Sequence, residues 1–211
     1  ASAIFGPVVL GHSDRFKVYG YSTYTEASSD LTSQSFRDDL IWRDVHDMTP
    51  STLARTVQED KIDILVDLSG YTRGHRLQTF CMRPAPVQVT AWGYALPTEL
   101  PVFDALFSDP VHMPWITRNL HSDPVVDLPC VVTYDPAPNM PKPGPLPNRP
   151  PVFASFNRPL KLDDEVLGLW REILQRVPDG RLILKAKHLD AAHQVWIAGA
   201  MGDTAGRVEF R

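Results

Sequence analysis

The sequence predicts an α/β protein made of two lobes, and three observations support this. Segments typical of strands alternate with segments typical of helices along most of the chain. A proline-rich stretch at 136–151 interrupts the alternation. The same strand–helix pattern then starts again at 152. Strands separated by helices favour parallel βαβ units with right-handed crossovers, so each lobe is expected to hold a parallel sheet.

The bulk composition argues against several classes of protein. The chain has 211 residues, 43% of them hydrophobic, with a formal net charge of −4 and a pI near 6.0. The basic residues are scattered, so no nucleic-acid partner is expected. No apolar run reaches about 18 residues and no secretory signal is recognisable, so no membrane association is expected. Cys81 and Cys130 lack CxxC spacing, which fits reduced thiols in the cytoplasm.

The first lobe is expected to span 1–135, and its clearest helix is 50–61. Thr49 can cap this helix, Pro50 suits its first turn, and Leu53 and Val57 line one face. The following segment, 62–68, is β-branched and mostly apolar, as expected of a strand buried on both faces. The other predicted strands are 16–22, 87–92, 105–108 and 125–128, and the other predicted helices are 75–82 and, weakly, 30–40.

The segment 136–151 is expected to be an extended, semi-rigid linker between the lobes. Each proline fixes φ and removes a backbone donor, which excludes a helix or a central strand here. The alternative is a proline-rich ligand for an SH3-type domain. Because strand–helix patterns flank the segment on both sides, the linker is the preferred interpretation.

The second lobe, 152–211, is expected to consist of three parallel strands and two helices. The predicted order is strand 152–156, helix 162–177, strand 181–187, helix 190–201 and a strand from 208. The apolar stripe of the first helix is Val166, Leu169, Trp170, Ile173 and Leu174. Such a sheet would expose an unpaired edge, and the first lobe begins inside a segment typical of a helix. Both lobes are therefore interpreted as incomplete pieces of a larger α/β protein.

Three loops that follow predicted strands lie where ligands bind in open parallel sheets, beyond the carboxyl ends of the strands. They are contained in Asp67–Gly74 (DLSGYTRG), Trp92–Tyr94 (WGY) and Ala154–Lys161 (ASFNRPLK), and a fourth run, Arg83–Gln88 (RPAPVQ), lies between the first two. In this order and spacing they resemble the catalytic region of protein O-GlcNAc transferases and SPINDLY proteins. The resemblance covers most of residues 16–210, and the chain is identified as a piece of the catalytic region of a bacterial homologue.

The resemblance implies a GT-B architecture, with two Rossmann-like lobes and the active site between them. It implies a nucleotide-sugar donor, typically UDP-GlcNAc, and an inverting transfer of the sugar to a Ser or Thr hydroxyl of a protein acceptor. It implies no metal and no cofactor, and the isolated chain is expected to be inactive. GDP-fucose is the rival donor, because SPINDLY relatives use it. A non-catalytic interaction or regulatory module built on the same fold is the alternative.

In the second lobe, the resemblance assigns Lys161 to catalysis, as the cation that contacts the donor diphosphate. Its place between a strand and a helix N-terminus suits phosphate binding, and the alternative is a solvated lysine. Arg158 stands where the family commonly has Gln; it is a candidate donor contact or a surface arginine. Asn157 is a candidate donor contact, or it only shapes the turn.

In the first lobe, Gly93 and Tyr94 match a family segment that lies against the donor, and Gly93 would permit close backbone approach. The alternative is a strand-end turn packed by aromatic side chains. Tyr71 and Thr72 are candidate donor contacts after the strongest predicted strand, or they belong to a loop in which Thr72 caps the next helix. His75 is interpreted as a solvated surface residue, and the histidines show no metal-binding spacing.

Overall fold

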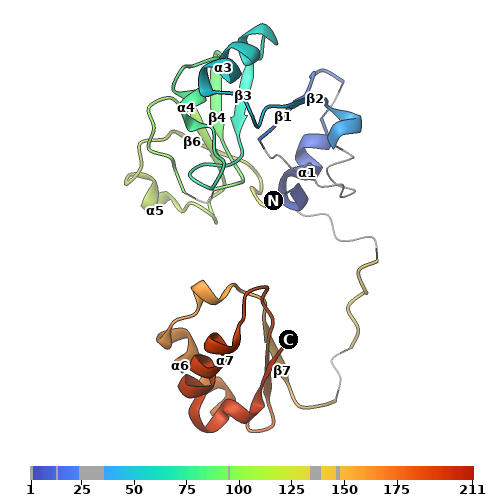
Figure 1. The fold of residues 1–211 in the computed structure, drawn as a ribbon, viewed down its shortest axis with the longest axis vertical. Helices are drawn as coiled ribbons and strands as arrows, with labels where there is room; N and C mark the ends of the chain where they lie inside the picture. The colour runs from blue at the N-terminus through green and yellow to red at the C-terminus, as the bar shows by residue number, and fades with distance from the viewer. Residues whose placement is uncertain (1, 13, 24–35, 95, 134–138, 146–147) are drawn as a thin grey trace. The chain divides into compact units, whose positions relative to one another are not determined.

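The computed structural model describes residues 2–12, 14–23, 36–94, 96–133, 139–145 and 148–211. The chain divides into two compact units, Ala1–Met140 and Pro141–Arg211 (Figure 1). Within the described residues, the strands form three sheets, all with parallel neighbours, and no sheet takes strands from both units. The predicted α/β class with parallel sheets is therefore confirmed.

The first unit contains a two-stranded sheet and a four-stranded sheet, in the orders β1-β2 and β3-β4-β5-β6. Its elements are α1 (Ser2–Leu10), β1 (Tyr19–Ser22), β2 (Ile41–Asp44), α3 (Pro50–Glu59), β3 (Ile64–Asp67), α4 (Leu77–Phe80), β4 (Val87–Thr90), β5 (Ala105–Ser108), α5 (Trp115–Arg118) and β6 (Val125–Asp127). The strand β2 was not predicted. Of the weakly predicted helix at 30–40, residues 36–39 are helical and 30–35 lie outside the described residues.

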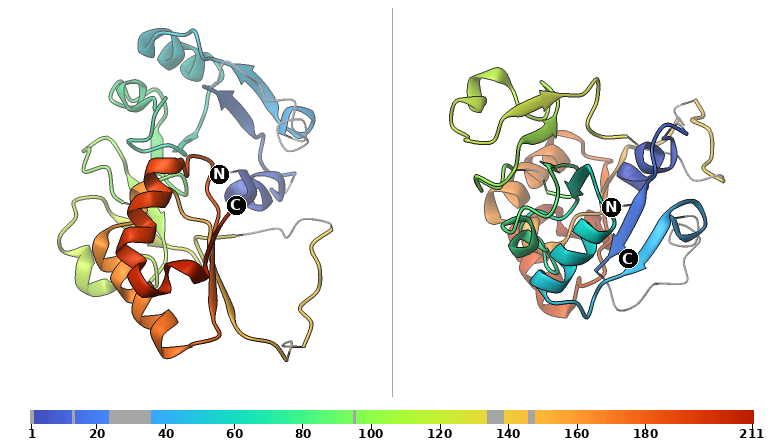
Figure 2. Two further views of the ribbon diagram at one scale, coloured as in Figure 1. Left: turned by 60° about the horizontal axis from the view of Figure 1, so that its bottom comes forward. Right: turned by 90° about the horizontal axis from the view of Figure 1, so that it is seen from above.

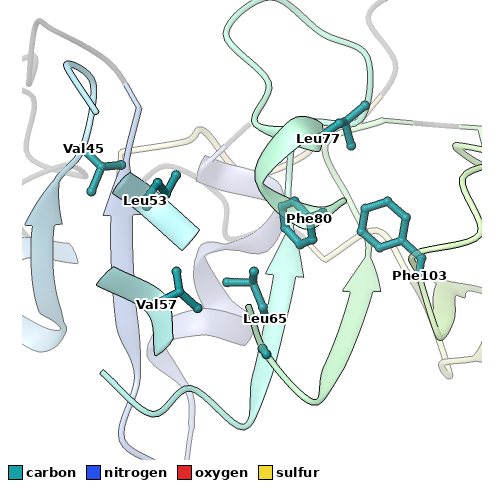
Figure 3. Packing of buried hydrophobic residues seen from close by; sticks show 8 residues of the cluster. Val45, Leu53, Val57, Leu65, Leu77, Phe80 and Phe103 are labelled. Atoms are coloured by element: carbon teal, nitrogen blue, oxygen red, sulfur yellow. The ribbon is translucent and has the colours of Figure 1, made fainter. Parts of the chain in front are cut away.

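The helix α3 begins where its sequence predicts. The Thr49 side chain accepts a hydrogen bond from the Thr52 amide at 3.2 Å, and Pro50 occupies the first turn. Leu53 and Val57 are buried in a core with residues from α4, β3 and the loop before β5. Figure 3 shows both side chains in one cluster with Leu65 and Phe80. The two-stranded sheet is fastened to the end of α3, because both Tyr21 and Arg43 donate to the Asp60 carboxylate.

The second unit is a three-stranded sheet in the order β7-β8-β9, so its predicted parallel strands are confirmed. Its elements are β7 (Val152–Ser155), the 3₁₀ turn η1 (Pro159–Lys161), α6 (Asp164–Arg176), β8 (Arg181–Leu184), α7 (Ala191–Met201), the 3₁₀ segment η2 (Gly202–Arg207) and β9 (Val208–Phe210). Asp163 and Asp190 cap α6 and α7 by accepting amide hydrogen bonds. Both helices lie on the same face of the sheet (Figures 1 and 2).

The predicted stripe of α6 is confirmed in part, because Leu174 is buried and Trp170 packs against the same core. Leu167 and Leu174 are buried against α7 and the sheet, whereas Leu169 and Ile173 are 54% and 42% exposed. Leu167, which the stripe did not include, is fully buried in the core that α6 shares with α7 and the sheet. β7 lies at one edge of this sheet and pairs with β8 alone among the described strands.

The described part of the proline-rich segment, 139–145 and 148–151, contains no helix or strand. Residues 136–138 and 146–147 of the predicted linker lie outside the described residues. The assignment of 1–135, 136–151 and 152–211 to a first lobe, a linker and a second lobe stays a prediction.

Candidate functional site

The loops that follow β3 and β4 leave the sheet side by side, because Asp67 is in register with Thr90 at the ends of the two strands. The Asp67 carboxylate is buried and accepts hydrogen bonds from the Ser69 amide at 3.1 Å, the Gly70 amide at 2.8 Å and the Thr90 hydroxyl at 3.1 Å. A buried carboxylate is tolerated only when it is hydrogen-bonded in this way. Asp67 therefore fixes the start of the loop that carries Tyr71 and Thr72.

Gly93 and Gly70 let these two loops touch. A Cβ atom built on Gly93 would lie 1.4 Å from the Leu68 carbonyl oxygen, so only glycine fits. Gly70 has φ +50°, and a Cβ there would lie 2.3 Å from the Cβ of Tyr94. The close approach expected at Gly93 is thus made to the neighbouring loop of the protein. Its role toward a donor stays a prediction.

Tyr71 is seated by contacts within the first unit. Its hydroxyl donates to the Thr98 carbonyl oxygen at 2.7 Å, and its ring meets Tyr94 edge-on at 5.8 Å between centroids. The Tyr71 proton is therefore committed to the protein. Its side chain is 49% exposed, which leaves part of the side chain available to a ligand.

Thr72 does not cap a helix, so that alternative is wrong. Its hydroxyl donates to the Ser69 carbonyl oxygen at 2.7 Å and closes a turn. The residue at the N-cap position of α4 is Arg76, which makes no side-chain capping bond. The Arg76 guanidinium instead donates to the carbonyl oxygens of Val45, His46 and Met48.

Two carboxylates that the sequence did not single out hold the segment after Tyr94. Asp123 is buried and accepts from the Thr98 amide at 2.8 Å. Glu99 accepts from the Ser122 hydroxyl at 2.6 Å, from the Ser122 amide at 2.9 Å and makes a 2.7 Å contact with His121 Nδ1. The Ser122 hydrogen bonds, supported by His121, lower the pKa of Glu99 to about 2. No motif marks these residues, because their partners lie more than twenty positions away in the sequence.

In the second unit, Asn157, Arg158 and Lys161 follow the carboxyl end of β7, and all three are exposed. Arg158 precedes η1, Lys161 ends it, and the Lys161 amide donates to the Arg158 carbonyl oxygen at 3.0 Å. Asn157 also lines an apolar groove of about 310 Å³ between β7 and α6, whose walls include Phe153, Trp170 and Ile173.

The N-terminus of α6 differs from the phosphate-binding helix start expected beside Lys161. The Asp163 carboxylate already accepts from the Val166 amide at 2.8 Å, and Asp164 and Glu165 add negative charge in the first turn. These groups oppose an anion at the helix start. The role of Lys161 toward a diphosphate stays a prediction.

The described structure thus gathers the candidate residues into two groups. Gly93, Tyr94, Tyr71 and Thr72 lie together at the carboxyl ends of β3 and β4, and Asn157, Arg158 and Lys161 lie together after β7. The expected approach of Lys161 to Gly93 and Tyr94 stays a prediction. Among the described residues there is no group of three or more His, Cys, Asp or Glu side chains arranged to hold a metal ion. No described helix is long and apolar enough to cross a membrane.

Comparison with known proteins identifies the relatives of this chain. Residues 8–131 match the model of glycosyl transferase family 41. The chain is 38% identical over 189 residues to the probable UDP-N-acetylglucosamine–peptide N-acetylglucosaminyltransferase SPINDLY of Arabidopsis thaliana, covering 84% of this chain and 20% of that protein. It is 36% identical over 196 residues to the probable transferase SEC of the same plant, covering 87% of this chain and 20% of that protein.

A solved structure matches almost the whole chain. It is a mutant O-GlcNAc transferase of Thermobaculum terrenum, with a TM-score of 0.90 and 34% sequence identity, covering 99% of this chain and 41% of that chain. The present chain spans about a fifth of the length of the curated relatives it matches.

Proposed function

The chain belongs to glycosyl transferase family 41, and on this premise we propose that it forms part of an enzyme that glycosylates proteins. The proposed reaction moves a sugar, GlcNAc from UDP-GlcNAc, onto a Ser or Thr hydroxyl of a protein acceptor. The activity belongs to the longer protein, since the chain spans only part of its relatives. The expected cytoplasmic location and the inactivity of the isolated chain remain predictions of the same proposal.

One observation carries this proposal. The similarity to a solved O-GlcNAc transferase extends over 99% of the chain at a TM-score of 0.90 and 34% identity. A match of this extent includes both units and both groups of candidate residues. Resemblance in fold alone would say little about activity, but here the sequence similarity to SPINDLY and SEC points to the same class of reaction.

In the proposed reaction, the acceptor oxygen forms a bond to the anomeric carbon while the bond from that carbon to the diphosphate oxygen breaks. The acceptor hydroxyl releases its proton to the solvent, and negative charge grows on the departing nucleoside diphosphate. A fixed positive charge beside that oxygen stabilises the transition state more than the ground state. We assign this role to Lys161, whose exposed position after β7 gives its ammonium group access to a ligand.

Arg158 and Asn157 are proposed as further donor contacts from the second unit. The guanidinium of Arg158 can bind phosphate oxygens in bidentate fashion, and it lies one short turn before Lys161. From the first unit, the backbone at Gly93 and the side chains of Tyr94, Tyr71 and Thr72 are proposed to form a wall against the donor. Because the Tyr71 hydroxyl is committed to Thr98, the exposed part of its ring is proposed to make the contact.

The experiment that tests this function is a transfer assay with the longer protein. The protein is incubated with UDP-GlcNAc or with GDP-fucose and a mixture of Ser- and Thr-containing peptides, and mass spectrometry measures the mass added. Addition of one N-acetylhexosamine from UDP-GlcNAc supports the proposal. Addition of a deoxyhexose from GDP-fucose would keep the enzyme class and replace the donor. No addition from either donor would favour the non-catalytic module.

A further inference from the structure

Asp123 is a buried carboxylate whose hydrogen bonds join two segments of the first unit that are far apart in the sequence. It lies shortly before β6, only 5% of its surface is exposed, and it accepts from the Thr98 amide at 2.8 Å. The Thr98 hydroxyl and the Glu99 amide lie at 3.4 Å from the same oxygen. Burying a charge is costly unless such bonds compensate it. The carboxylate therefore fixes the backbone of Thr98 relative to the strand that follows Asp123.

A second carboxylate repeats this link in the opposite direction. Glu99 has φ +56°, a left-handed conformation that costs a residue with a side chain about 1–2 kcal/mol. Its carboxylate accepts from both the amide and the hydroxyl of Ser122, the residue before Asp123. Residues 98–99 and residues 122–123 thus bind each other's main chain, each through a carboxylate. The reciprocal bonds explain why the strained backbone at Glu99 is retained.

Thr98 in turn holds Tyr71, which contacts Tyr94. Its carbonyl oxygen accepts from the Tyr71 hydroxyl at 2.7 Å. The Tyr71 ring contacts Tyr94 edge-on at 5.8 Å, with the planes at 78°. The backbone at Gly70 closes the other side of Tyr94, since a Cβ there would lie 2.3 Å from the Cβ of Tyr94. A continuous chain of contacts therefore runs from Asp123 through Thr98 and Tyr71 to Tyr94.

We propose that Asp123 is a positioning residue for the donor wall. By fixing Thr98, it sets the orientation of Tyr71 and Tyr94, and it acts on both rings through Thr98. This inference rests on the proposed function, because the two tyrosines are assigned there as donor contacts. In this proposal, Asp123 affects donor binding through Tyr71 and Tyr94 and does not itself contact the donor.

The test compares Asp123→Asn with two other variants. Tyr71→Phe removes only the hydroxyl that binds Thr98. Asp127→Asn is the matched control, because the Asp127 carboxylate lies in the same part of the chain and pairs with Arg118. Ring-proton chemical shifts of Tyr71 and Tyr94 are measured in the 211-residue chain. The donor KM and kcat are measured in the longer enzyme, with thermal melting as a check on folding.

Asp123→Asn and Tyr71→Phe are each expected to shift the Tyr94 ring signals and to raise the donor KM, with a smaller change in kcat. Loss of one such hydrogen bond is expected to change KM by roughly tenfold. The double variant should be little worse than either single variant, because both act through one contact chain. Asp127→Asn should leave the ring signals and KM unchanged.

Three results would overturn the inference. The Tyr71 and Tyr94 signals could stay unchanged in a folded Asp123→Asn protein. The effects of Asp123→Asn and Tyr71→Phe on KM could simply multiply in the double variant. The donor KM could respond equally to Asp127→Asn. If the longer enzyme transfers no sugar, the proposed function fails, and the ring signals alone decide whether Asp123 positions the two tyrosines.

Discussion

Lys161 places a positive charge in an exposed 3₁₀ turn directly after β7. Replacing it in the longer enzyme by Lys161→Met keeps the length of the side chain and removes the charge. We expect kcat to fall by roughly 10²- to 10³-fold, the usual loss when one preorganised charge at a developing anion is removed. Steady-state kinetics with UDP-GlcNAc measures this, and kcat should change more than KM because the charge grows in the transition state.

Two comparisons sharpen the Lys161 experiment. Arg158→Met should have a smaller effect, and Lys142→Met, an exposed lysine in the proline-rich segment, should have none. Near-normal transfer by Lys161→Met would show that the lysine is a bystander.

Gly93 predicts a stability effect that does not depend on the proposed function. Gly93→Ala would place a methyl group onto the Leu68 carbonyl oxygen, so a loop must shift. We expect the free energy of unfolding to fall by about 1–3 kcal/mol, as for other overpacked positions. Gly168→Ala is the control: it lies on the exposed side of α6 with open space around it, and should raise stability by about 0.5–1 kcal/mol. Urea denaturation measures both, and an equal response would contradict the packing seen at Gly93.

Glu99 predicts a pH dependence at the acidic end. Its pKa is lowered from 4.5 to about 2, chiefly by Ser122. A lowered pKa in the folded state means that the stabilisation is complete above the unfolded value near 4.5 and is lost as the pH falls toward about 2. An NMR titration of the Glu99 carboxyl should give this low midpoint, and Ser122→Ala should raise it. A midpoint near 4.5 in the unsubstituted chain would contradict the hydrogen bonds described.

At the level of single residues, the sequence predicted which side chains lie together but not which hydrogen bonds they make. Gly93, Tyr94, Tyr71 and Thr72 lie together, as their places after two strands suggested. Asp123 could not have been predicted, since its partner lies 25 positions away and no local pattern records such a bond. The hydrogen bond from the Tyr71 hydroxyl to Thr98 could not be predicted for the same reason.

Among the helices and strands, local signals predicted elements better than faces. Thr49 and Pro50 set the start of α3 because a cap acts within one turn. The strand β2 was missed because its four residues include Arg43 and Asp44 and show no apolar run. In α6, the predicted stripe included the buried Leu174 but missed Leu167, because packing against α7 and the sheet, and not the period of the sequence alone, decides which apolar residues are covered.

The position of β7 at the edge of its sheet leads to a prediction about self-association. β7 pairs with β8 alone among the described strands, and Phe153 on it is 37% exposed. Unpaired edges with apolar side chains tend to associate. We expect the 211-residue chain to self-associate with rising concentration in sedimentation velocity runs. Phe153→Lys should reduce this, whereas Val195→Lys, on the exposed side of α7, should not. Equal association of the two variants would exclude the β7 edge as the contact.

For the molecule as a whole, the alternation of strands and helices predicted the parallel α/β class, and the order of four short runs predicted the family. Both were confirmed, the first by the parallel pairing of every neighbouring strand described and the second by the match over residues 8–131. The alternation and the short runs did not predict the donor, the acceptor or the approach of the two groups of candidate residues. The identities of the donor and the acceptor depend on contacts with substrates, which local sequence patterns do not record.

Calorimetric titration of the longer protein with UDP, UDP-GlcNAc and GDP-fucose tests most directly whether this family member binds a nucleotide-sugar donor. We predict saturable binding of UDP and UDP-GlcNAc, with GDP-fucose weaker, and a loss of affinity for UDP in Lys161→Met because the diphosphate loses a cation. Preferential binding of GDP-fucose would contradict the proposed donor. Binding of none of the three by the folded protein would contradict the donor-binding site itself and, with it, the assignment of Lys161.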